Sequence, residues 1–313
     1  MRGQILLILF TGVLLSACNG SFSGISGEYD SLGVALDVDV SSDFAYIADV
    51  ENGLVVLDVI YPLNPNLAAA EPTHGSARTV KATGNYVLVG TDAGIDIYDV
   101  RDPYNPYFMT FYASEGVVNA IEIYNNMAIV STSTGIEILS LQDYQSIHTI
   151  ARFTIPSRST YTSRDTIYIA SDDIRRIDIT SIDSPIFLDR IYTDGYAMDV
   201  IVNGNYIYVA DGYRGIKIYE KINPDSLVLL SSMDTQGEAR DIELISTLDR
   251  RFLVVADLDG GLRVIDITDP ASPVEVEQVD IPGNAYAVDY SDGYAYVCAG
   301  TRGLRIIRLN LEQ

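Results

Sequence analysis

A pair of marker residues recurs about every 42 residues after residue 20, and this period constrains the fold more than any other feature. Seven such units indicate one closed repeat architecture and argue against two or three unrelated domains. The first marker of each unit is Gly33, Gly75, Gly116, Ser157, Gly195, Gly237 and Gly283. The second marker is Gly53, Gly94, Gly135, Asp173, Gly215, Gly261 and Gly303.

The fifth unit shows how each unit divides into strands. Its strand-like runs are separated by turn signals such as Asn203-Gly204-Asn205, and no helical period lies between them. The expected strands are residues 197–202, 206–210 and 216–219 and a fourth strand beginning at Leu227. Four short antiparallel strands make a meander sheet, and seven such sheets around one axis make a propeller. We therefore predict an all-β fold, a seven-bladed β-propeller of four-stranded antiparallel blades.

The seventh unit is incomplete, because the chain ends soon after its third strand at residues 304–309. The segment Ser23 to Tyr29 precedes Gly33 with the spacing of a fourth strand. We expect this N-terminal segment to complete the last blade, which would close the ring and protect its edge. Residues 27–313 then form a single propeller domain.

The N-terminus has the pattern of an export signal. Arg2 precedes an apolar run at residues 5–15, which is too short for a transmembrane helix of about 20 residues. The run ends in Leu15-Ser16-Ala17-Cys18, which resembles the lipobox of bacterial lipoproteins. The resemblance implies a signal peptide at 1–17, lipidation of Cys18 and a flexible tether at 18–26. The alternative is an ordinary secretory signal with a chance cysteine.

The same resemblance implies a location. A lipidated Cys18 would anchor the protein to a membrane of the bacterial cell envelope or to the cell surface. Asn19, which follows the cysteine, favours the outer membrane over retention in the inner membrane.

The phrases Gly261 to Pro273 and Tyr206 to Asp211 resemble the LVIVD repeat, which occurs in exported bacterial and archaeal propeller-like proteins. The resemblance covers residues 33–309 and is strongest in units 1, 2, 5, 6 and 7. Unit 3 lacks the Asp-Pro turn, and unit 4 has Asp173 in place of glycine. The chain contains no tryptophan, which excludes a close match to the WD40 type. The family brings no general catalytic motif to these residues.

Net charge, hydrophobic content and cysteine usage limit the possible partners, the size of the core and the role of Cys298. The net charge of −23 disfavours nucleic acid as a partner. The hydrophobic content of 48% is enough for a large core. Cys298 occupies a repeat position that otherwise carries Ala, Gly or Ser, so we expect a small buried side chain and not a reactive thiol.

The first strands carry Asp37, Asp199 and Asp241 at one repeat position. First strands line the channel of a propeller, so these acids are candidates for a ring in the pore. The same position holds Thr79 and Ala120 in other units, which argues against a metal site. The alternative role is to bond backbone groups of neighbouring strands. We predict no metal and no cofactor.

Two further patterns leave alternatives open. Small polar residues begin the turns between strands two and three, where they could bind a cation or cap the turn, and capping is favoured. They are Asp49, Thr91, Thr132, Ser171, Asp211 and Asp257. The third strand changes from acidic to basic along the chain, which would give either a bipolar disc or paired charges between blades. These residues are Asp96, Glu137, Arg175, Lys217, Arg263 and Arg305.

These observations favour a non-catalytic envelope or cell-surface lipoprotein, a rigid scaffold that binds an extracellular or envelope protein or a glycan. The expected binding face carries the turns between strands two and three, with Tyr213, Arg214 and Arg302 as its most distinctive groups. One alternative is an enzyme, a lyase or hydrolase, with its active site at the channel mouth. Another is an envelope assembly factor, by analogy of fold alone.

Overall fold

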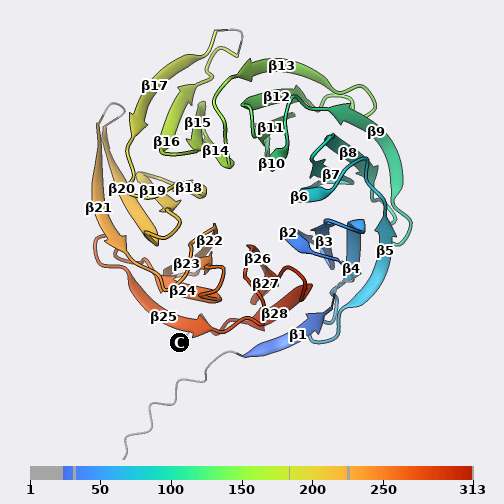
Figure 1. Cartoon of the computed structure of the whole chain (residues 1–313). Coiled ribbons are helices and arrows are strands. Elements are labelled where there is room, and N and C mark those ends of the chain that lie inside the picture. The colour runs from blue at the N-terminus through green and yellow to red at the C-terminus, as the bar shows by residue number, and fades with distance from the viewer. Residues whose placement is uncertain (1–23, 31–32, 183, 224–225, 312–313) are drawn as a thin grey trace, which may run out of the picture.

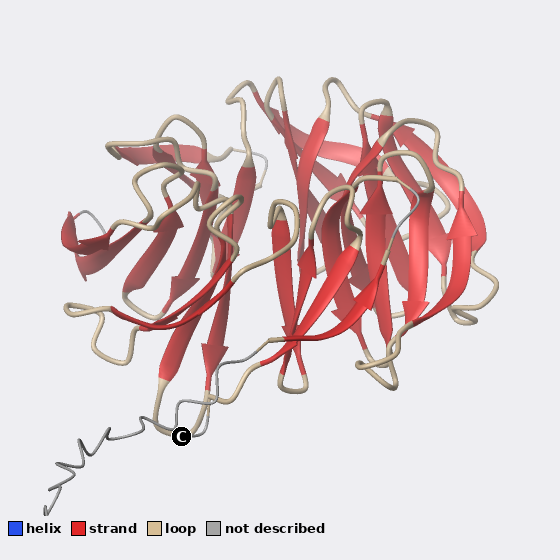
Figure 2. Ribbon diagram, turned by 60° about the horizontal axis from the view of Figure 1, so that its bottom comes forward, coloured by secondary structure: helices blue, strands red, loops and turns tan. Residues whose placement is uncertain are grey.

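The structure is a computed structural model that describes residues 24–30, 33–182, 184–223 and 226–311. These residues form seven antiparallel sheets of four strands around a central axis, as predicted (Figure 1). The described residues contain no helix (Figure 2). The expected signal peptide, Cys18 and the first part of the expected tether lie outside the described residues.

Each blade begins with an inner strand beside the axis and ends with an outer strand at the rim (Figure 1). The innermost strands are β2 (Ala35–Ser41), β6 (Ala77–Thr83), β10 (Val118–Tyr124), β14 (Ser159–Ser163), β18 (Asp199–Asn203), β22 (Asp241–Ser246) and β26 (Ala287–Ser291). The second strands are β3 (Phe44–Asp49), β7 (Tyr86–Thr91), β11 (Met127–Thr132), β15 (Thr166–Ala170), β19 (Tyr206–Ala210), β23 (Arg251–Ala256) and β27 (Tyr294–Cys298).

The third strands are β4 (Gly53–Asp58), β8 (Gly94–Asp99), β12 (Ile136–Ser140), β16 (Ile174–Asp178), β20 (Ile216–Asn223), β24 (Leu262–Asp266) and β28 (Leu304–Arg308). The outer strands are β5 (Asn66–Glu71), β9 (Tyr107–Ala113), β13 (His148–Phe153), β17 (Ile186–Ile191), β21 (Ser226–Met233), β25 (Val274–Val279) and, in the last blade, β1 (Ile25–Tyr29).

The ring closes through its N-terminal strand, as the short seventh unit predicted. β1 pairs antiparallel with β28, and Tyr29 lies opposite Leu304. β1 begins at Ile25, inside the segment Ser23 to Tyr29 that we expected to complete the blade and also inside the range 18–26 that we assigned to the tether. A pair of backbone hydrogen bonds between Ala35 and Gly300 joins the last blade to the first near the axis. The chain thus enters the disc at its outer rim (Figure 1).

The marker glycines are required where two turns of one blade approach closely. A Cβ on Gly237 would lie 2.0 Å from the carbonyl oxygen of Asp257. Gly215 adopts a φ of +67°, and its Cβ would lie 2.2 Å from the carbonyl oxygen of Met233. Both contacts are too short for any side chain, which explains why glycine recurs with the period of the blade.

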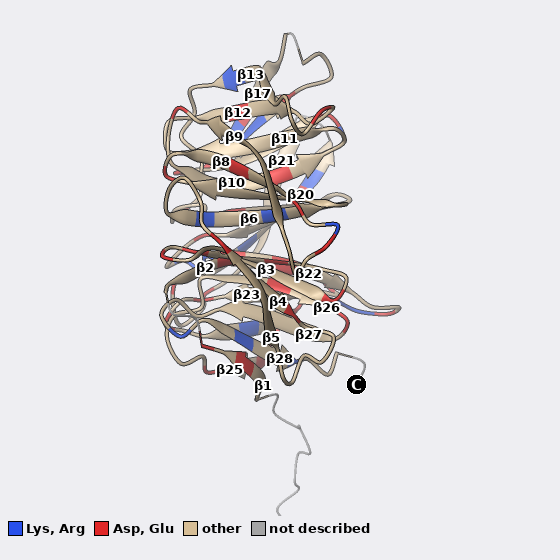
Figure 3. Ribbon diagram, turned by 90° about the vertical axis from the view of Figure 1, so that its right-hand side faces the viewer, with Lys and Arg blue, Asp and Glu red and all other residues tan. Residues whose placement is uncertain are grey.

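The core lies between the faces of adjacent blades, in seven clusters of buried apolar residues. Cys298 is fully buried in the cluster between the last and first blades, as predicted, and burial raises the pKa of its thiol well above the usual value. Acidic residues are distributed over several blades when the disc is viewed from its edge (Figure 3).

The charged side chains of the third strands, acidic in the second and third blades and basic in the later ones, are not a surface feature, so neither alternative from the sequence is correct. Arg263 and Arg305 are buried at 0% and 3% exposure. They pair mainly inside their own blades, for example Arg263 with Glu275 of the outer strand and Arg305 with Asp30 beyond β1. The buried Asp96 likewise accepts a hydrogen bond from the backbone N–H of His74 in the turn that enters its blade.

Candidate binding site at the channel mouth

The three predicted channel acids lie in the channel, on first strands, as expected. Each carboxylate accepts a backbone hydrogen bond from the first strand of the next blade. Asp37 accepts from Val80 at 2.9 Å, Asp199 from Ile242 at 3.3 Å and Asp241 from Val288 at 2.7 Å. The acids therefore bond the backbones of neighbouring blades, which is the structural role that the sequence offered as the alternative.

Burial changes the acidity of these carboxyls. It raises the pKa of Asp37 to about 6, partly offset by the hydroxyl of Thr79, which donates to the carboxylate at 2.7 Å. Burial also raises the pKa of Asp199 and of Asp241, and the neighbouring charge of Asp199 raises that of Asp241 further. Charging both buried carboxyls at once is therefore unfavourable.

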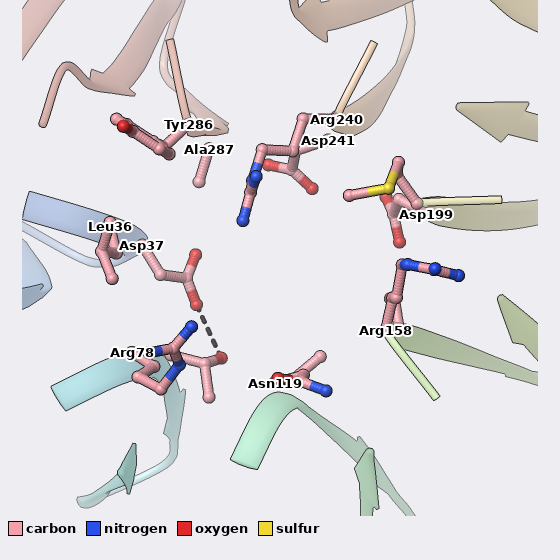
Figure 4. A pocket seen from close by; sticks show the side chains of 14 residues that line it. Leu36, Asp37, Arg78, Asn119, Arg158, Asp199, Arg240, Asp241, Tyr286 and Ala287 are labelled. Atoms are coloured by element: carbon pink, nitrogen blue, oxygen red, sulfur yellow. Dashed lines mark hydrogen bonds between the residues drawn. The ribbon is translucent and has the colours of Figure 1, made fainter. Parts of the chain in front are cut away.

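Three arginines that the sequence reasoning missed line the channel mouth beside these acids. Arg78, Arg158 and Arg240 each stand one residue before the acid position of their unit, in the second, fourth and sixth blades. They surround a cavity of about 350 Å³, with the acids between them (Figure 4). Comparing the units one residue upstream of the acid position would have found them.

The arginines differ in how far they are neutralised. Arg158 is ion-paired with Asp172 at 3.2 Å, and its guanidinium lies over the ring of Tyr196. Arg240 lies over the ring of Tyr286, at 5.4 Å from its centroid. Across the described part of the chain, neither Arg78 nor Arg240 forms an ion pair. Two cations at the mouth are therefore available to an anion.

A second cavity of about 430 Å³ continues the channel and shares Asp37, Asp199 and Asp241 with the first. It adds a further layer of charged side chains, namely Asp39, Lys81, Glu122, Glu243 and Asp289. Lys81 is ion-paired with Asp39. The channel is therefore basic at its mouth and becomes mostly acidic from Asp37, Asp199 and Asp241 inward.

Burial dominates the pKa shifts of this inner layer as well. It raises the pKa of Glu122 to about 7, of Glu243 to about 8 and of Asp289 to about 6. Burial alone would lower the pKa of Lys81, but the charge of Asp39 and the hydrogen bond with it raise the pKa above its ordinary value.

The predicted binding groups Tyr213, Arg214 and Arg302 border the mouth without lining the cavity. All three are exposed, Tyr213 at 72%. Backbone bridges join Gly212 to Ala239 and Gly300 to Ala35, so the two turns that carry these groups lie next to the starts of β22 and β2. We call this side, with the turns between strands two and three and the arginines, the mouth face.

The small polar residues of these turns act as structural groups, in two ways. In the first three blades they cap their own turn, as when Asp49 accepts from the backbone N–H of Glu51 and Asn52. In the fifth and sixth blades the side chain instead accepts from the marker glycine of its blade, as Asp257 does from Gly237 at 2.8 Å. Within the described residues, no group of three or more His, Cys, Asp or Glu side chains is arranged to hold a metal ion.

Comparison with protein families gives one match. A family model described as the LVIVD repeat matches residues 32–70, 74–114, 194–235, 236–281 and 282–307, which together make up more than half of the chain. These are the units in which the sequence resemblance is strongest. No curated protein matches the chain. No helix in the described part of the chain is long and apolar enough to cross a membrane.

Solved structures share the fold at low identity. The WD40 β-propeller domain of Doa1 is 13% identical, with a TM-score of 0.72 over 91% of this chain and 96% of that domain. The β-propeller domain of Cps50 (Swd1) from Myceliophteria thermophila is 13% identical, with a TM-score of 0.71 over 92% and 100%. The designed Ika8 protein is 11% identical, with a TM-score of 0.64 over 92% and 100%. These likenesses extend to the fold alone.

Proposed function

The chain belongs to the LVIVD repeat family, and we propose that it is a non-catalytic, lipid-anchored binding protein of the bacterial cell envelope. Its binding site is the mouth face, and its partner is an envelope or extracellular protein or a glycan. The observation that carries the proposal is the convergence of Arg78, Arg158 and Arg240 on one mouth of the channel. In a chain with a net charge of −23, two arginines without an ion pair form a local site for an anionic group.

The scaffold suits binding more than turnover. The acids at the mouth are held by backbone N–H groups of the next blade, so they serve to fix the geometry of the ring. The surrounding Tyr213, Arg214 and Arg302 supply exposed aromatic and cationic contacts of the kind enriched at interfaces. A rigid ring that presents preformed contacts loses little freedom on binding.

The proposed anchor is a lipid on Cys18, with the outer membrane as the location. The likeness of residues 15–18 to a lipobox supports it. Because β1 begins at Ile25 on the outer rim, a short tether from Cys18 would hold the disc close to the membrane. Cys18→Ala should release the protein from the membrane fraction, and persistence of the variant in that fraction would contradict the anchor.

The test of the binding face is photo-crosslinking in the native membrane followed by identification of the captured molecules. The triple variant Tyr213→Ala, Arg214→Ala, Arg302→Ala should lose capture. A matched control is Tyr107→Ala, which removes a tyrosine that is 70% exposed beside the β8–β9 turn, at the opposite end of the strands. Equal capture by both variants would exclude the mouth face. Capture of outer-membrane assembly machinery would identify an assembly factor.

An enzyme at the channel mouth is the second candidate, because one observation favours it. Asp199 and Asp241 both line the mouth cavity, and burial raises the pKa of both carboxyls, as an acid and a base at a catalytic site require. A lyase or hydrolase would then cleave a glycan at the mouth. If the native protein forms products from envelope polysaccharides and Asp241→Asn does not, the enzyme is supported. If the native protein forms no product, the binding role is retained.

A further inference from the structure

The channel mouth has two chemically distinct layers, and together they define what it can hold. The outer layer consists of Arg78, Arg158 and Arg240, which come from alternate blades. Arg158 points away from the middle of the cavity and pairs with Asp172, so Arg78 and Arg240 are the guanidinium groups available there (Figure 4). The inner layer offers the carboxyls of Asp37, Asp199 and Asp241, which lie between the two cavities. A ligand that satisfies both layers needs an anionic group at one end and hydrogen-bond donors at the other.

The donors that suit the inner layer are hydroxyl groups. Asp241 accepts one backbone N–H from the next blade. Asp37 accepts two backbone N–H groups and the hydroxyl of Thr79, which leaves capacity for one more donor on each of the two carboxyls. A neutral hydroxyl can donate there without adding charge beside these buried acids. A second carboxylate or a phosphate in the inner layer would be repelled by these acids.

The side walls add apolar and neutral polar surface. Tyr286 presents a half-buried ring against which the guanidinium of Arg240 is already stacked. Asn119 is fixed by a hydrogen bond from its side-chain N–H to the carbonyl of Ser157 at 2.8 Å. A sugar ring has one face of C–H groups that can pack on the tyrosine ring, while its edge carries hydroxyls.

From this arrangement we infer that the mouth binds a sugar acid, such as a uronic acid unit, with its carboxylate on Arg78 and Arg240 and its hydroxyls toward the acids below. This inference rests on the proposed binding function and names the class of ligand. The cavity of about 350 Å³ lies near the lower end of small-molecule sites, roughly 300–1,000 Å³, which fits one or two sugar rings. The unit can be a free sugar acid or the end of an acidic polysaccharide.

An acidic peptide is the less suitable occupant. Its carboxylate would satisfy the arginines, but its side chains and backbone offer fewer hydroxyl donors to the inner layer. Extended nucleic acid is disfavoured, because its repeating phosphates would meet Asp37, Asp199 and Asp241 immediately below the mouth.

The experiment is isothermal titration calorimetry of the full chain in detergent with galacturonic acid, trigalacturonate, methyl galactoside and sodium sulfate. We expect galacturonic acid to bind with a Kd of about 1 mM or tighter, and methyl galactoside to bind at least about tenfold more weakly. Tighter binding of trigalacturonate identifies a polysaccharide end, and equal binding identifies a free sugar acid. Equal affinity for the uronate and the neutral sugar would overturn the inference, as would binding of sulfate alone.

Variants locate the site. Arg78→Gln and Arg240→Gln should each weaken uronate binding at least about tenfold. Arg308→Gln, an exposed arginine at the end of β28 that does not line the cavity, is the matched control and should bind as the native protein does. An equal loss in all three variants would show nonspecific charge attraction and would overturn the assignment. The comparison of uronate with neutral sugar on the native chain needs no variant and so does not depend on variant folding.

Together, the calorimetry and the capture experiment distinguish failure of the sugar-acid assignment from failure of the proposed binding function. If uronates do not bind while the triple variant at Tyr213, Arg214 and Arg302 still abolishes capture in membranes, the mouth face binds a protein and only the sugar-acid assignment fails. If neither experiment detects binding, the proposed function fails with it.

Discussion

Replacing Glu243 with glutamine should make the protein less sensitive to alkaline pH. Glu243 lies on β22 inside the channel, where burial and then the charge of Asp289 raise the pKa of its carboxyl to about 8. Lys81 opposes this shift only in part. The uncharged carboxyl is therefore the form that the channel accommodates, and glutamine has nearly the same shape.

The sign of the effect follows from where the two states lose their proton. In the unfolded chain the carboxyl ionises near its ordinary value of 4.5, whereas in the folded channel it stays protonated to about 8. Its contribution to stability is complete below the unfolded value and is lost as pH rises toward 8. At 1.36 kcal/mol per unit, this single group costs on the order of 5 kcal/mol across that window as an upper limit, since channel water stabilises part of the charge.

The assay is urea unfolding of the native chain and Glu243→Gln at pH 5 and pH 9, followed by the midpoint and slope of each transition. Between pH 5 and pH 9, the free energy of unfolding of the native chain should fall by about 1–4 kcal/mol more than that of the variant. The variant should retain some pH dependence, because Glu122 and Asp289 have raised pKa values as well. The control is Asp249→Asn in the exposed turn after β22. An identical pH dependence of native chain and Glu243→Gln would refute the reasoning.

Three further predictions concern the ring itself. Asp37→Ala leaves the backbone N–H of Val80 without its partner and should lower the free energy of unfolding by about 1–3 kcal/mol, with Asn restoring part of it; denaturation of both variants checks this. Cys298 should not react with a maleimide reagent in the folded protein and should react fully in urea, and fast labelling of the native state would contradict its burial. Arg263→Ala leaves the buried Asp257 without its cation and should cost about 3–5 kcal/mol, so an unchanged melting temperature would show that this pair is dispensable.

The blade architecture could be predicted because its geometry leaves a direct trace in the sequence. Turns of one blade approach so closely that Gly237 and Gly215 have no room for a side chain, and the requirement returns with every blade. The exception in the fourth blade is also explained locally. Ser157 fits there because its hydroxyl contacts the carbonyl of Ser159 in its own blade and the hydroxyl of Ser131 on β11 of the third blade.

The third-strand charges were misread because a strand in a propeller is covered on both sides. Alternating polar residues usually mark a solvated face of a sheet. Here Arg263 and Glu137 lie between packed blades and are buried, and their charges are met by side chains of the outer strands, Glu275 and Arg152. Sequence alone does not say which neighbouring strand supplies the partner charge.

The channel mouth could not be assembled from the sequence, because its residues come from blades that are distant in the chain. The channel-facing position before each acid site is Leu36, Arg78, Asn119, Arg158, Met198, Arg240 and Tyr286. Neighbouring blades carry different residue types at this position, whereas packing fixes the glycine and apolar positions in most blades. Blade packing therefore places no demand on this position, and its side chains are free to be set by a ligand. Arg78 and Arg240, which form no ion pair in the described part of the chain, both occupy this position. The channel mouth is therefore a better place than the rim to look for the ligand.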